Sequence, residues 1–226
     1  HSVREPRQID TWLDTEDGER LVLWQSPASD GRPTILYLPG NAGGLKDRVP
    51  RFSQLIDAGY GVVALGYRGS SGSSGQPDEA LLTGDAILVA RMIENTPTIL
   101  YGESLGTAVA IKIAASGLGD AIVLEAPFTS IKELISAQYP TEDLSHLVTQ
   151  EWDSVSGMDG VAQPLMVIHG SEDRVVPVEM GQRVFALARS EDKTFLKVDG
   201  VGHKGLWTED GRTALFKFFE RSTRQR

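Results

Sequence analysis

The chain has 226 residues, of which 40% are hydrophobic and 23% charged, and its formal net charge is −9. This composition is typical of a globular protein, and we expect residues 1–226 to form a single domain. The negative charge disfavours nucleic acid as a partner, because phosphate binding needs a clustered cationic surface. The chain contains no cysteine, which excludes disulfides and thiolate nucleophiles.

Short apolar runs bounded by glycine or proline recur along the chain and predict buried strands. They cover residues 20–25, 34–38, 61–65, 99–101, 121–124, 165–168 and 194–198. Helical patterns lie between most of these runs, in residues 79–95, 105–116, 178–188 and 210–221. Trp12 and Leu13 are expected to pair antiparallel with residues 21–24. Alternating strands and helices predict an α/β fold, in which helices cover both faces of a mostly parallel sheet.

A candidate nucleophile follows the predicted strand that ends at Tyr101. The next five residues read Gly-Glu-Ser-Leu-Gly, with Ser104 at their centre, and a helical pattern follows. This strand–turn–helix context is typical of a nucleophile elbow, in which a sharp turn exposes the serine. A glycine-bounded turn with an incidental serine is the alternative.

A nucleophilic serine needs a histidine as base and a carboxylate that orients it. Of the four histidines, His203 lies between glycines after the last predicted strand and is the preferred base. His1 is terminal, His146 lies in a polar stretch, and His169 ends a strand, where a backbone hydrogen bond is expected. Asp173 is the preferred acid.

Two other carboxylates remain alternatives to Asp173. Glu172 is its neighbour, and Asp199 begins an Asp-Gly pair that is more typical of a turn.

A glycine-rich turn after the predicted strand 34–38 is suited to an oxyanion hole, with Asn41 or Ala42 as one backbone donor. The other donor would be Leu105, directly after the nucleophile. No Gly-Lys-Ser or Gly-Lys-Thr follows this turn, which argues against a phosphate-binding loop. Residues 66–72 loosely match a dinucleotide fingerprint but lead into a Ser/Gly loop, where Arg68 is expected to bind a carboxylate or carbonyl.

Several motifs together resemble one known family. In chain order they are Leu-Pro-Gly-Asn-Ala-Gly, Tyr-Arg-Gly-x-x-Gly-x-Ser, Tyr-Gly-Glu-Ser-Leu-Gly, Ala-Pro-Phe-Thr-Ser and His-Gly-x-x-Asp-x-x-Val-Pro. From about residue 33 to residue 220 the chain is similar to compact α/β-hydrolases of the serine aminopeptidase-like and monoacylglycerol-lipase-like type. The resemblance implies an eight-stranded fold, the triad Ser104, Asp173 and His203, and oxyanion donation from Asn41 and Leu105. Relatives usually have His-Gly before the asparagine, where this chain has Pro-Gly.

These observations predict a serine hydrolase that acts on a small-molecule ester, most simply a short-chain or aryl ester, without a metal or organic cofactor. An exopeptidase, amidase or thioesterase on the same triad is the alternative, and a non-catalytic binding protein is a more distant one. Residues 127–163 are expected to form a small cap. The candidate pocket-lining residues are Phe128, Tyr139, Trp152 and Trp207.

No apolar run reaches the roughly 18 residues of a membrane span, which favours a cytoplasmic protein. Because the chain opens with His1 rather than methionine, a signal or anchor removed before that residue stays an open alternative.

Overall fold

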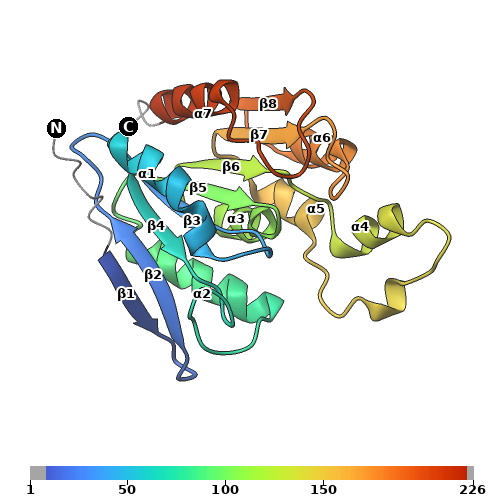
Figure 1. The fold of residues 1–226 in the computed structure, drawn as a ribbon, viewed down its shortest axis with the longest axis horizontal. Coiled ribbons are helices and arrows are strands. Elements are labelled where there is room, and N and C mark those ends of the chain that lie inside the picture. Colours follow the sequence, from blue (N-terminus) through green and yellow to red (C-terminus); the bar gives the residue numbers. More distant parts are fainter. Residues whose placement is uncertain (1–8, 223–226) are drawn as a thin grey trace.

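The computed structural model describes residues 9–222, which build one eight-stranded sheet with helices on both faces (Figure 1). The strands are β1 (Ile9–Asp14), β2 (Arg20–Ser26), β3 (Thr34–Leu38), β4 (Gly61–Leu65), β5 (Thr98–Glu103), β6 (Ala121–Glu125), β7 (Leu165–Gly170) and β8 (Lys193–Val198). Their order across the sheet is β1-β2-β4-β3-β5-β6-β7-β8. Strand β2 runs antiparallel to β1 and β4, and the remaining pairs are parallel. The predicted fold class is confirmed.

The antiparallel edge has the expected register, because Trp12 pairs with Val22 and Leu13 with Leu21. The central strands alternate their side chains between two cores. Leu36 packs on one face of the sheet, whereas Tyr37 packs on the other. This alternation follows from the period-2 geometry of a strand.

Seven α-helices and three short 3₁₀ helices are present among residues 9–222. The α-helices are α1 (Val49–Asp57), α2 (Glu79–Met92), α3 (Leu105–Ala115), α4 (Ile131–Gln138), α5 (Ser154–Gly157), α6 (Val178–Leu187) and α7 (Glu209–Ser222). The 3₁₀ helices are η1 (Leu45–Arg48), η2 (Ser145–Leu147) and η3 (Met158–Gly160). Helices α2, α3 and α6 contribute to the core on one face, and α1 and α7 to the core on the other. No helix in this described range combines the length and apolar character that a membrane crossing requires.

The connection between β6 and β7 is the longest in the described chain and carries α4, η2, α5 and η3. In Figure 1, α4 and the loop after it lie beyond the arrowheads of β5, β6 and β7. This segment therefore stands at the edge of the sheet where the parallel strands end, which is the edge where ligands bind in open α/β sheets.

Candidate active site

Ser104 lies in the tight turn between β5 and α3. Its φ of 50° and ψ of −112° fall in a region that residues with a side chain rarely adopt. A Cβ atom on Gly106 would lie 1.9 Å from the carbonyl oxygen of Leu38, and one on Gly102 would lie 2.4 Å from the carbonyl oxygen of Gly106. The Gly-x-Ser-x-Gly spacing thus allows β5, α3 and β3 to approach closely while the serine side chain points away from the core.

His203 contacts both of the other residues of the candidate triad. Its Nε2 atom is 3.1 Å from Oγ of Ser104, and its Nδ1 atom is 2.8 Å from Oδ2 of Asp173. Because an ionised carboxylate only accepts hydrogen bonds, Nδ1 carries the proton and Nε2 is free to accept one from the serine. The arrangement matches the nucleophile–base–acid order of a serine hydrolase.

Backbone contacts hold the loop after β7 against the loop after β8. The N–H of Glu172 donates to the carbonyl of Val201 at 2.9 Å. The two loops also pack so closely that a Cβ atom on Gly170 would lie 2.2 Å from the same carbonyl oxygen. These contacts bring Asp173 and His203 together although they are 30 residues apart.

Asp173 is held in its ionised form by several donors. The N–H groups of Val175 and Val176 bind Oδ1 at 2.9 and 2.8 Å, and Nε2 of His169 lies 3.4 Å from Oδ2. Burial alone would raise the pKa of Asp173, but hydrogen bonds from His169, His203 and the backbone of Val176 outweigh it and hold this pKa well below its usual range.

The other histidines have different surroundings. His169 is fully buried, and its Nε2 lies 2.9 Å from the carbonyl oxygen of Val176, which confirms the expected backbone hydrogen bond. Its proximity to Asp173 was not expected from the sequence. His146 is exposed, and His1 lies outside the described residues.

Among the described residues, the hydrogen bond from Nδ1 of His203 goes to Asp173 and not to the side chain of either alternative acid. Glu172 is exposed, and the side chain of Asp199 is 86% exposed in a turn after β8. Arg68 forms a buried bidentate pair with Asp85 and also binds Asp17, as expected for a residue that ties its loop to a carboxylate.

A cavity of about 1320 Å³ opens beside the candidate triad. Ser104 and His203 line it, together with Asn41, Ala42 and Leu105. Leu105 is the first residue of α3, and the first N–H groups of a helix have no intrahelical partner. The candidate oxyanion donors therefore share one cavity with the candidate nucleophile.

Three of the four expected lining residues contribute to this cavity, namely Phe128, Trp152 and Trp207. Tyr139 is not among them. It directly follows the end of α4 and is 49% exposed. Further apolar lining comes from Ile131, Leu134, Ile135, Leu147 and Val148.

Sequence reasoning missed two buried arginine–glutamate pairs beside Ser104. Arg48 binds Glu103 through Nε and Nη2 at 3.0 and 2.7 Å, and Arg51 binds Glu125 through Nη1 and Nη2 at 2.8 and 3.1 Å. Glu103 was visible as the residue before the candidate nucleophile, but no local pattern distinguishes these arginines from surface cations.

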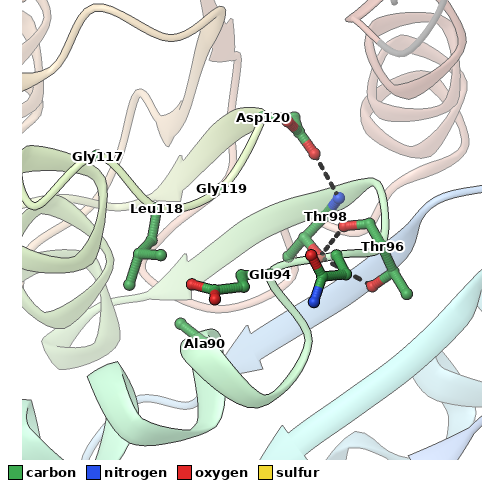
Figure 2. A pocket seen from close by; sticks show the side chains of 9 residues that line it. Ala90, Glu94, Thr96, Thr98, Gly117, Leu118, Gly119 and Asp120 are labelled. Atoms are coloured by element: carbon green, nitrogen blue, oxygen red, sulfur yellow. Dashed lines mark hydrogen bonds between the residues drawn. The ribbon is translucent and has the colours of Figure 1, made fainter.

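A second, smaller cavity of about 310 Å³ lies at the other edge of the sheet, near the beginnings of β5 and β6 (Figure 2). Its wall includes Thr98, whose N–H donates to Asp120 at 2.8 Å. This cavity is separate from Ser104, which follows the opposite end of β5.

The chain was compared with known proteins, and no family model matches it. An uncharacterized protein of Mycobacterium tuberculosis is 34% identical over 218 residues, which cover 93% of this chain and 77% of that protein. The lysophosphatidylserine lipase of Rattus norvegicus is 31% identical over 201 residues, which cover 78% of this chain and 50% of the lipase. The solved esterase Pf2001 of Pyrococcus furiosus has the same fold, with a TM-score of 0.79 and 18% identity over 95% of this chain and 90% of that one.

Proposed function

Because the chain belongs to the α/β-hydrolase superfamily, we propose that it is a serine hydrolase that cleaves carboxylic esters through an acyl-enzyme intermediate. The observation that carries the proposal is the hydrogen-bonded series from Ser104 through His203 to Asp173, at 3.1 and 2.8 Å. A fold alone does not establish an activity, whereas these three side chains in contact provide nucleophile, base and orienting acid.

In the proposed mechanism, Nε2 of His203 takes the proton from Ser104 while Oγ attacks the ester carbonyl carbon. The carboxylate of Asp173 stabilises the imidazolium that forms. The backbone N–H groups of Asn41 and Leu105 bind the tetrahedral oxyanion. His203 then protonates the departing alkoxide, and a water molecule, deprotonated by the same histidine, releases the acid from the acyl-enzyme.

The cavity supports an ester with an apolar acyl group. Side chains from α4 and the loop before α5 give it an apolar wall, whereas Arg48, Arg51 and Gln54 lie on the side of η1 and α1. Short-chain or aryl esters are the first candidates, as the sequence suggests. The cavity of about 1320 Å³ is larger than the roughly 300–1000 Å³ of common ligand pockets, so such an ester would fill only part of it.

A second candidate is an ester with one long acyl chain and a polar head. The volume of about 1320 Å³ favours it, because a short acyl chain would leave much of the apolar wall uncovered. The similarity to a protein named lysophosphatidylserine lipase is consistent with such a substrate.

Hydrolysis of p-nitrophenyl esters from acetate to palmitate, compared between wild type and Ser104→Ala, tests the proposal. We expect Ser104-dependent turnover, with the preferred chain length separating the two substrate candidates. Matched anilides and thioesters are measured in parallel. Faster Ser104-dependent cleavage of either would replace the esterase assignment by an amidase or thioesterase, and equal activity of the two proteins would exclude Ser104 as nucleophile.

A further inference from the structure

Two glutamates stand side by side at the ends of the strands that flank Ser104. Glu103 on β5 and Glu125 on β6 are direct partners in the parallel register, and Ser104 itself donates its N–H to the carbonyl of Glu125 at 2.8 Å. Like charges on paired strands repel each other. The nucleophile turn therefore needs nearby cations, and the arginines of η1 and α1 supply them.

Arg51 neutralises Glu125 and packs its guanidinium group over the ring of Trp207, with 4.6 Å between Cζ and the ring centroid. It fastens α1 to the sheet. Arg48 differs because it also contacts the glycine-rich loop that carries Asn41. Its Nη1 donates to the carbonyl of Gly44 at 3.0 Å while Nε and Nη2 hold Glu103.

This glycine-rich loop, residues 40–44, is held at its end, where the N–H of Gly44 donates to Oδ2 of Asp47 at 2.9 Å. Asn41, Ala42 and Gly43 are exposed, and Gly43 has a φ of 75°. Glycine-rich backbone is flexible unless outside contacts fix it. An oxyanion donor, however, must stay at hydrogen-bond distance from the position where the charge develops.

The loop lies directly on the nucleophile turn. A Cβ atom on Gly40 would lie 3.3 Å from the carbonyl oxygen of Glu103 and 3.3 Å from Cβ of Ser104. The Glu103 carboxylate is further held by the hydroxyl of Tyr37 at 2.6 Å. The side chains of Arg48 and Glu103 are only 9% and 22% exposed, so solvent screens their attraction weakly.

We propose that Arg48 and Glu103 are positioning residues that hold residues 40–44 in register with Ser104. This assignment rests on the proposed function, because it concerns the oxyanion site of that reaction. The pair joins the residue before the nucleophile to the loop that presents the Asn41 N–H. Without the pair, the backbone N–H of Asn41 is no longer held at hydrogen-bond distance from the oxyanion. This weakens transition-state binding and leaves substrate binding largely unchanged.

The kinetic test compares Glu103→Gln with Asp85→Asn. Each variant neutralises a carboxylate that an arginine binds in bidentate fashion. The arginine that binds Asp85 is Arg68, whereas the arginine that binds Glu103 is Arg48, which also contacts the glycine-rich loop. We expect Glu103→Gln to lower kcat about 10- to 100-fold with KM little changed. Asp85→Asn should keep wild-type kcat even where it lowers thermal stability. Equal kcat losses in the two variants, or a loss confined to KM, would overturn the proposal.

Hydrogen–deuterium exchange provides a readout that does not depend on activity. Amides of residues 41–45 should exchange faster in Glu103→Gln and in Arg48→Met than in wild type and Asp85→Asn. Arg48→Lys keeps the charge and should restore part of the protection. Unchanged exchange in both Glu103→Gln and Arg48→Met would contradict the positioning role. If the wild-type protein hydrolyses no ester but the variants still exchange faster, only the proposed function is contradicted.

Discussion

At the scale of single residues, the candidate site depends on backbone positions that only glycine can occupy. Gly106 allows the first turn of α3 to lie against the end of β3. Ser104 keeps an unfavourable φ of 50° because this packing fixes the turn on both sides. Local strain of this kind is typical of functional sites, where the surrounding fold supplies the stability that the turn lacks.

We predict that Gly106→Ala destabilises the fold by about 2–3 kcal/mol or more, because its Cβ would collide with the backbone carbonyl of Leu38. The matched control is Gly84→Ala inside α2, where a Cβ meets nothing within 4 Å. That change should stabilise the protein by roughly 0.5–1 kcal/mol. Urea unfolding followed by circular dichroism measures both. Similar midpoints for the two variants would be inconsistent with the packing described here.

We also predict that Asp173→Asn lowers kcat by about 10⁴-fold, the loss known for the same change in a serine protease triad. Asparagine would disturb the Nδ1–H tautomer that directs Nε2 toward Ser104. Steady-state ester hydrolysis measures the effect, and Glu172→Gln in the exposed neighbour should retain activity. A larger loss in Glu172→Gln would move the role of the acid to that residue.

At the scale of elements, helix α2 begins with a side-chain cap. The carboxylate of Asp78 accepts hydrogen bonds from the N–H groups of Ala80 and Leu81 at 2.9 and 3.1 Å. Asp78→Ala should therefore cost about 1 kcal/mol of stability, whereas Asp78→Asn, which keeps an acceptor, should cost much less. Chemical denaturation of both variants is the measurement. Equal losses would mean that charge, and not the cap, stabilises this end.

The strands and most helices were predictable because their signals are local. Each predicted strand falls within an observed one, and the helix starting after Ser104 was placed by the same motif that suggested the candidate nucleophile. Helix α1 was not predicted, although Phe52 and Leu55 have helical spacing and are buried. The helix begins only a few residues after the glycine-rich loop, so the sequence offers no clear boundary between the turn and the helix.

The proximity of Ser104, Asp173 and His203 was predictable for a related reason: each follows a parallel strand, and such strand ends meet at one edge of the sheet. The arginine–glutamate pairs were not predictable. Arg48 and Glu103 are 55 residues apart, and Arg51 and Glu125 are 74 apart. Their contacts depend on strand register and on the position of α1, which no local pattern specifies.

At the scale of the whole molecule, two buried carboxylates near the site link stability to pH. Asp173 keeps a low pKa for the reasons given above. Burial alone would raise the pKa of Glu103, but hydrogen bonds from Arg48 and Tyr37 outweigh burial and lower it. Both carboxylates therefore bind protons more weakly in the folded chain than in the unfolded chain, where their pKa values are about 4.

We predict that the free energy of unfolding is independent of these two groups above about pH 5 and falls as the pH drops from there toward 2. The unfolded chain takes up protons first in this range, which favours unfolding. Urea unfolding at several pH values gives the slope of the free energy of unfolding against pH. Between about pH 5 and 2 this slope should be smaller in Asp173→Asn than in wild type. Ser104→Ala keeps both carboxylates and should retain the wild-type slope. An unchanged slope in Asp173→Asn would contradict the assignment.

The central claim is that Ser104 is an activated nucleophile. Its most direct test is reaction with a fluorophosphonate probe, followed by mass spectrometry of the labelled peptide. We predict one covalent adduct on Ser104 in wild type, slow or absent labelling in His203→Ala, and none in Ser104→Ala. Labelling at another residue, or no labelling of the folded wild-type protein, would contradict the account.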